Sequence, residues 1–438
     1  MITHAERRPS RHLTPSPHHL IILLLIAATT APGCTAPLKP GVADLPPIPR
    51  AVPGVYTDIN PRWSHDGARV AFLRSTPDRR LQLFVTDADL NRASALLESE
   101  LVTPDRPYDS QLCRYSSPNT IAWSPNDHRI AFERAEWFQF DDGQRLPGTG
   151  IWSIDVRSGR VTAIALHPKR YTDLYYYYHN PSWSPDGSYI SFTAEGINGQ
   201  RLLGLRCLFD EKPKEVGTHF DNYAATDWPA WRPVVGRNER PALSCFRAIF
   251  RTASIPVTAA IVSMQPGSVS SEQSRELLRI RPAQYSELVS VRRGAFKREA
   301  IEPRIAQPAW SPDGRRLAFA VTPDPKNPDR YAIWLLDSMT GVARQVSPDD
   351  DCGYNAPVWI DSNRIGALSP RAGKYDIVEI DLTRGTRRKL GVIPTADCDW
   401  SPDRSKIVYA TPPLSTPNSP DDPTTLQIRE TGLSATDR

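Results

Sequence analysis

The fold of this protein is decided by the stretch Gln307–Phe319, which reads QPAWSPDGRRLAF. Its centre fits a type I turn. Ser311 suits the first position, Pro312 suits the second because its φ is fixed, and Gly314 closes the turn. Trp310 before the turn and the apolar run after it are typical of strands bounded by turn residues. The stretch therefore predicts a β-hairpin.

The same hairpin recurs along the chain and places seven tryptophans at equivalent positions: Trp63, Trp123, Trp183, Trp231, Trp310, Trp359 and Trp400. A second hairpin follows several copies, as in Ile151–Val161, Ala332–Val346 and Tyr375–Gly385. Four short strands per repeat are typical of a propeller blade, whereas a β-sandwich needs no sequence repeat. We predict an all-β protein, a β-propeller of four-stranded blades. Seven blades are expected, with six or eight as alternatives.

These Trp-Ser-Pro-Asp-Gly hairpins resemble those of the TolB-type β-propeller family, with its WD40-like repeats. The resemblance covers about Val55 to Thr411, most of the chain. It implies a propeller fold, but it says little about function, because such propellers serve as scaffolds, as caps on peptidases and occasionally as enzymes.

Residues 1–34 have the pattern of a bacterial export signal. Arg7, Arg8 and Arg11 precede the short apolar stretch Leu20–Ala28, and Cys34 resembles the acylated cysteine of a lipoprotein. Residues 35–54 are rich in proline and predict an extended tether. We expect a periplasmic protein, anchored as an outer-membrane lipoprotein. Plain secretion and a single membrane anchor are the alternatives.

The remaining domain boundaries follow from the repeats. The propeller is expected over residues 55–412, and residues 413–438 are expected to form a C-terminal strand and a loose tail. The strand at Leu426–Ile428 would close the ring with a segment near Val55 or within one hairpin. The wide spacing between Trp231 and Trp310 predicts an insertion at about 264–300, with a short helix at Ser270–Ile280. An eighth blade is the alternative.

The cysteines and the charge narrow the possible functions. The five cysteines beyond Cys34 have no Cys-x-x-Cys spacing, so no zinc or redox pair is indicated. A Cys352–Cys398 disulfide and free thiols both remain possible. The 438 residues carry a formal net charge of only +4 without a basic run, so nucleic acid is not an expected partner.

No catalytic motif is present in the sequence. It contains no Gly-x-Ser-x-Gly elbow, Walker loop, His-Glu-x-x-His or EF-hand loop. His65 and His128 fall in hairpin turns, which leaves few histidines for a metal cluster. We therefore expect no catalytic residue, no cofactor and no metal, and a binding role is favoured over an enzymatic one.

The segments leading into the repeat tryptophans suggest a binding mouth. They are rich in Tyr, Asn and Asp, residue types that suit a peptide or sugar site. The candidate ligand-binding residues are Tyr56, Asp58, Asn60, Tyr176, His179, Asn180, Asp221, Tyr223, Tyr354 and Asn355. Because strand residues alternate, about half of Tyr175–Tyr178 is expected to face the core.

We interpret the chain as a non-catalytic envelope scaffold. The resemblance implies an envelope protein or peptide segment as partner. One alternative is a carbohydrate-binding or lyase-like propeller, which would need His179 and His219 with Asp58 or Asp350 at a metal. Another is a sensor or assembly platform with the 264–300 insertion as its docking face.

Overall fold

The structure is a computed structural model. It describes residues 57–75, 81–101, 121–139, 145–166, 175–196, 201–208, 214–218, 224–234, 236, 240–252, 255–264, 275–280, 305–321, 331–348, 350, 352–411 and 425–433. All of these belong to the unit Ala51–Arg438. Every regular element in this part of the chain is a strand. Within it, no helix exists that is long and apolar enough to cross a membrane.

The strands form seven separate antiparallel sheets, each following the order of the chain. Blade 1 contains β1 (Thr57–Trp63), β2 (Arg69–Ser75), β3 (Leu81–Asp87) and β4 (Ser94–Leu101). Blade 2 contains β5 (Ile121–Trp123), β6 (Arg129–Gln139), β7 (Arg145–Asp155) and β8 (Val161–Ala165). Blade 3 contains β9 (Tyr175–Trp183), β10 (Tyr189–Gly196), β11 (Arg201–Cys207) and β12 (Lys214–Thr218).

The later blades repeat the pattern. Blade 4 contains β13 (Ala224–Arg232), β14 (Ala242–Thr252), β15 (Ile255–Met264) and β16 (Arg275–Ile280). Blade 5 contains β17 (Ile305–Trp310), β18 (Arg316–Val321), β19 (Ala332–Asp337) and β20 (Ala343–Gln345). Blade 6 contains β21 (Asn355–Trp359), β22 (Arg364–Arg371), β23 (Lys374–Asp381) and β24 (Thr386–Ile393). Blade 7 has three described strands, β25 (Cys398–Trp400), β26 (Lys406–Tyr409) and β27 (Gln427–Glu430).

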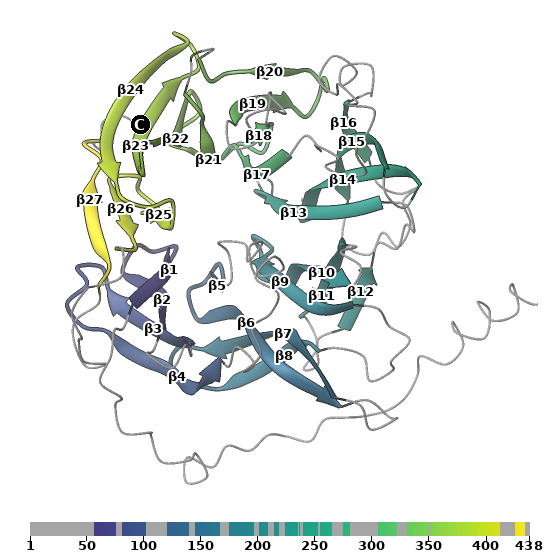
Figure 1. Cartoon of the computed structure of the whole chain (residues 1–438), viewed down its shortest axis with the longest axis vertical. Helices are drawn as coiled ribbons and strands as arrows, with labels where there is room; N and C mark the ends of the chain where they lie inside the picture. Colours follow the sequence, from purple (N-terminus) through teal and green to yellow (C-terminus); the bar gives the residue numbers. More distant parts are fainter. Residues whose placement is uncertain are drawn as a thin grey trace, which may run out of the picture. The chain divides into compact units, whose positions relative to one another are not determined.

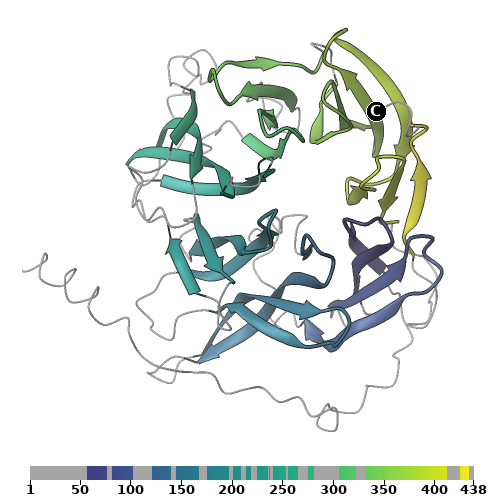
Figure 2. The same cartoon turned by 180° about the vertical axis from the view of Figure 1, so that it is seen from behind.

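The sheets close into a ring, with the first strand of each blade innermost (Figures 1 and 2). A buried apolar cluster lies between every pair of neighbouring blades. The last cluster joins blade 7 to blade 1 through Val408, Leu426, Trp63 and Phe72. Each blade therefore buries its apolar faces only against its neighbours, so the predicted seven-bladed all-β propeller is confirmed.

The repeat tryptophans join the blades. Six of the seven end the first strand of their blade, and Trp231 is the last residue but one of β13. The indole Nε1 of Trp123 donates a hydrogen bond to the carbonyl oxygen of Arg62 at 3.0 Å, and that of Trp359 donates to Ala309 at 2.9 Å. Both carbonyls belong to the residue before the tryptophan of the preceding blade, so one position of the repeat binds two blades together.

In blades 6 and 3 the second strand makes room for the next tryptophan. A Cβ at Gly366 would lie 2.8 Å from the ring of Trp400. At the equivalent place in blade 3, Ser191 Oγ accepts the Trp231 Nε1–H at 3.0 Å. Because real Cβ atoms do not approach this closely, the small residue in the middle of the Ile-Gly-Ala and Ile-Ser-Phe runs is a packing requirement.

The turns form as predicted, with the aspartate holding its own loop. Ser311 Oγ donates to Asp313 Oδ1 at 2.5 Å, and Gly314 N donates to the Ser311 carbonyl at 2.8 Å. The same Ser–Asp bond forms at Ser64–Asp66, Ser184–Asp186 and Ser401–Asp403. Burial alone would raise the pKa of Asp313, but hydrogen bonds from Ser311 and from the Arg315 N–H outweigh it and hold that pKa below its ordinary value.

We expect Asp313→Ala to lower the melting temperature, with a loss of about 1 kcal/mol in the free energy of unfolding. Asp313→Asn keeps an acceptor oxygen and is the matched control. The lowered pKa means that the carboxylate stabilises the fold above its ordinary pKa and that this contribution disappears as the pH falls through the folded-state pKa. Thermal melts at neutral pH and near pH 3 test both points. An Asp313→Ala melting curve identical to that of the wild type would contradict the structural role.

One sequence expectation about the fold needs correction. The described part of the expected helix Ser270–Ile280 is a strand, because Arg275–Ile280 is β16, the fourth strand of blade 4, paired with β15. Leu277 is buried in the cluster shared with blade 5, so this part of the expected insertion belongs to the blade. Residues 265–274 and 281–304 lie outside the described residues.

Cys352 and Cys398 are free thiols rather than a disulfide. Desolvation of the half-buried Cys398 thiol raises its pKa to about 12.

Candidate functional site

The first strands begin at one end of the ring, which we call the entry end. All of them finish at the opposite end, at the turns that follow the repeat tryptophans. Most of the predicted ligand-binding residues that the structure describes lie on these first strands, between the entry end and the tryptophans.

A backbone irregularity explains the asparagines at this end. Asn60 and Asn180 have φ angles of 58° and 56°, and Gln307 and Ala356 at the same repeat position have 54° and 50°. The pairing of the first and second strands shifts register there, as at a β-bulge. Asn tolerates positive φ better than most residues, so the recurring Asn-Pro pairs mark a bulge. The bulge alone therefore accounts for these asparagines, and their ligand-binding role stays a prediction.

Asp58 closes the ring and is not open to a ligand. Its side chain is fully buried, and Arg74 donates to both carboxylate oxygens, from Nε at 2.8 Å and from Nη2 at 3.0 Å. Thr425 N donates to Asp58 Oδ2 at 2.7 Å, which fixes the start of β27 against blade 1 (Figure 1). The sequence feature that indicates this structural role of Asp58 is the pair of opposite charges, since Asp58 and Arg74 face each other across the first hairpin.

Two further carboxylates fasten blade 7 to blade 1. Asp397 Oδ2 accepts the Asn60 N–H at 2.7 Å, and Asp399 Oδ2 accepts the Trp63 N–H at 2.8 Å. Burial raises the pKa of both carboxyls, while Arg62 and these backbone hydrogen bonds oppose the rise. The C-terminal strand, β27, pairs with β26 of the same blade. Of the two expected closures, the one within a hairpin therefore forms. Side-chain hydrogen bonds complete the junction between blades 7 and 1.

Tyr354 is also buried, contrary to its predicted place in an open mouth. Only 1% of its surface is exposed. Its hydroxyl donates to Asp350 Oδ2 at 2.6 Å and accepts from Arg387 Nη1 at 2.7 Å. Burial and the bond to Asp350 raise the pKa of this phenol. The aromatic ring therefore fills the core between blades 5 and 6. Its neighbour Asn355 is half-buried at the start of β21.

A partly exposed aromatic pair lies on the first strand of blade 3, β9. The rings of Tyr177 and His179 stack with centroids 6.1 Å apart and 5° between their planes. His179 Nδ1 lies 3.1 Å from Glu133 Oε1 of blade 2, and the two side chains are 23% and 19% exposed. Tyr178 between them packs on Phe192 at 5.0 Å, which confirms that the tyrosine run alternates between core and surface.

Several predicted residues cannot be placed. Tyr56, Asp221, Tyr223 and His219 lie outside the described residues, as does Cys34. Tyr176 belongs to β9, but its side chain is not described. Within the described ranges, no group of three or more His, Cys, Asp or Glu side chains is arranged to hold a metal ion. Asp58 and Asp350, proposed with His179 for a lyase-like metal site, are bound instead to Arg74 and Tyr354.

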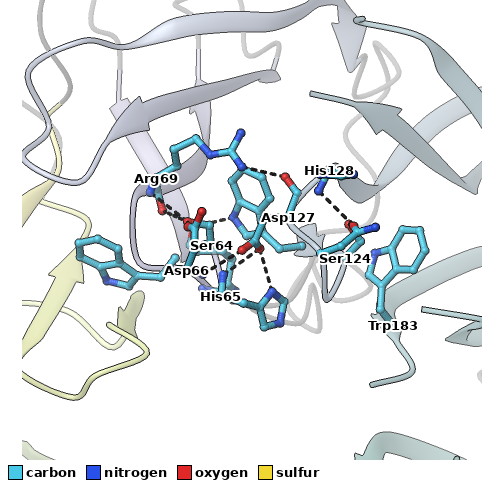
Figure 3. A network of polar contacts seen from close by, with 12 residues as sticks. Ser64, His65, Asp66, Arg69, Ser124, Asp127, His128 and Trp183 are labelled. Carbon is cyan, nitrogen blue, oxygen red and sulfur yellow. Dashed lines mark hydrogen bonds and ion pairs between the residues drawn. The ribbon is translucent and has the colours of Figure 1, made fainter. Parts of the chain in front are cut away.

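A polar network at the turn end joins blades 1 and 2 (Figure 3). Asp127, at φ 56° in the place where other turns have Gly, accepts the His65 N–H and the Asp66 N–H, both at 2.8 Å. His65 stands where the turns of blades 2, 3, 5 and 7 have Pro, which has no N–H to donate. Two departures from the repeat thus compensate each other. The prediction that His65 and His128 belong to hairpin turns is confirmed.

Comparison with known proteins supports the fold and goes no further. No family model matches the chain, and no curated protein matches it. An oligogalacturonate lyase solved in complex with manganese is 12% identical, with a TM-score of 0.52, covering 81% of this chain and 86% of the lyase. The oligogalacturonate lyase of Vibrio parahaemolyticus is 11% identical, with a TM-score of 0.51 and coverages of 83% and 88%. Both likenesses show a common propeller fold.

TolB from Acinetobacter baumannii is also similar in structure. It is 16% identical, with a TM-score of 0.37, covering 78% of this chain and 64% of TolB. That score is too low to support an inference about relationship or function, so the TolB-type resemblance rests on the hairpin motif.

Proposed function

We propose that this protein is a non-catalytic binding scaffold of the bacterial envelope. The observation that carries the proposal is the stacked Tyr177–His179 pair, partly exposed on an innermost strand beside the Glu133 carboxylate. An aromatic surface with a few hydrogen-bonding groups suits recognition of a peptide segment. Asp58 and Asp397, two other polar residues of this region, hold blades 7 and 1 together instead.

The proposed partner is a segment of another envelope protein, in line with the TolB-type resemblance. The proposed location is the periplasm, with a lipid on Cys34 as anchor. Both rest on residues 1–34 and on the motif resemblance.

We expect the double variant Tyr177→Ala/His179→Ala to lose partner binding by about tenfold or more while folding normally. A photo-crosslinking amino acid at position 177 of the full chain, in extract of the producing bacterium, should yield one defined protein adduct. Position 342, a Val that is 63% exposed on a blade 5 turn, is the matched control. Equal adducts from both positions, or binding unchanged in the double variant, would disprove the proposed site.

Carbohydrate binding is the second candidate, favoured by the presence of oligogalacturonate lyases among structures of the same fold. Glu133 and His179 could hydrogen-bond sugar hydroxyls while Tyr177 stacks on the ring. Calorimetry with an oligogalacturonate, with and without manganese, distinguishes metal-independent sugar binding from a lyase-like site that needs the metal. Binding that disappears in the double variant would favour the sugar, and binding that appears only with the metal would favour the lyase-like form.

A further inference from the structure

A separate cavity opens on blade 6, also at the entry end. Its volume is about 490 Å³, and it is lined by Pro370–Tyr375 and Pro394–Ala396. The first segment is the hairpin joining β22 and β23, and the second joins β24 to β25. Because Asn355, at the start of β21, pairs with Leu368 near the end of β22, this hairpin projects from the entry end. The volume lies in the range of sites that bury small ligands.

The cavity is positively charged. Arg371 is 73% exposed and lies 3.7 Å from the Asp376 carboxylate, which Lys389 approaches to 2.7 Å. Lys374 is exposed and has no hydrogen-bond or ion-pair partner among the described residues. Asp376 and Lys389 lie outside the cavity lining, so the charged residues that line the cavity are Arg371 and Lys374, which give it two positive charges. The contact of Arg371 with Asp376 is long and its guanidinium is exposed, so it contributes little to stability, and Arg371 and Lys374 are available to a ligand.

The strand register places two of these cations against each other. Arg371 and Lys374 are direct partners across the β22–β23 pair. The turn between them is two residues long, with φ angles of 42° at Ala372 and 79° at Gly373, so it holds the two side chains at one level. Like charges directly opposite each other destabilise a hairpin. A bound anion would relieve that repulsion.

We propose that this cavity binds a carboxylate side chain of an acidic peptide segment, with Arg371 and Lys374 as its two cationic contacts. Carboxylates accept the charge-assisted hydrogen bonds that guanidinium and ammonium groups donate. A peptide is favoured because the cavity is a short open site on the end where a protein segment is proposed to dock. The inference uses none of the residues of the Tyr177–His179 pair, so either site can fail without the other.

The test uses the full chain and a fluorescein-labelled hexaglutamate peptide, with binding followed by fluorescence anisotropy at low and moderate salt. We expect binding that weakens as salt is added, because the contacts are exposed charges. Arg371→Glu/Lys374→Glu should weaken it by about tenfold or more. Arg384→Glu is the control. It reverses a charge that is 79% exposed in the β23–β24 turn, at the other end of the same blade, and it should leave binding unchanged.

Thermal melts of all three proteins should agree, since the changed side chains are exposed. An equal loss of peptide affinity in the double variant and in Arg384→Glu would mean that the peptide is attracted by the general positive charge of the protein. That result would overturn the proposal. Absence of peptide binding by the wild type would overturn it as well. So would displacement of the peptide by an oligogalacturonate at a much lower concentration than by unlabelled peptide, because the site would then be a sugar site.

Discussion

Replacing Asp58 with alanine is expected to lower the free energy of unfolding by about 3–5 kcal/mol, the cost of leaving one partner of a buried ion pair alone. Arg74 is only 2% exposed in its side chain and would lose both of its bonds to the carboxylate. Its guanidinium lies over the rings of Phe72 and Phe84, at 5.7 and 4.6 Å, where water cannot replace the lost partner. Thermal and urea unfolding of the full chain would measure the loss.

The control removes both charges at once. Asp58→Asn/Arg74→Gln leaves no unpaired charge and should recover much of the stability lost by the single variant. Because Thr425 also bonds to Asp58, the single variant should in addition loosen β27, seen as faster amide exchange in Gln427–Glu430. A single variant as stable as the wild type would show that the ring does not depend on this closure.

Trp123→Ala is expected to cost about 3–5 kcal/mol, because a large aromatic ring would leave a cavity in the seam between blades 1 and 2. The ring is 4% exposed, belongs to the cluster shared by these blades, and carries the guanidinium of Arg69 at 4.9 Å from its centre. The lost Nε1–H bond to Arg62 adds to the effect.

Trp123→Phe is the matched control. It keeps most of the apolar volume and removes the indole N–H, whose hydrogen bond should be worth about 1 kcal/mol. Denaturant unfolding should rank the wild type first, then Trp123→Phe, then Trp123→Ala. Equal losses for the two variants would mean that the hydrogen bond, rather than the packing, joins the blades.

The sequence alone determined the repeat and everything local to it. The Ser-Pro-Asp-Gly turn depends on side-chain and backbone preferences of adjacent residues, so Ser311 and Asp313 behave as their types predict. The alternation of Tyr178 into the core follows from the two-residue period of a strand. The number of blades followed from counting tryptophans, because each blade repeats one unit.

Tertiary structure decided what the polar residues near the ring's centre do. Asp58, Asn60 and Tyr354 have the composition of a binding mouth. Asp58 and Asn60 instead fasten blade 1 to blade 7 through Thr425 and Asp397, which are distant in sequence. Tyr354 fills the core between blades 5 and 6. Arg275–Ile280 carries helix-forming residues, but β15 offers it an open edge and blade 5 an apolar surface for Leu277. Burial against a neighbour outweighs local preference, and the neighbours exist only once the ring has closed.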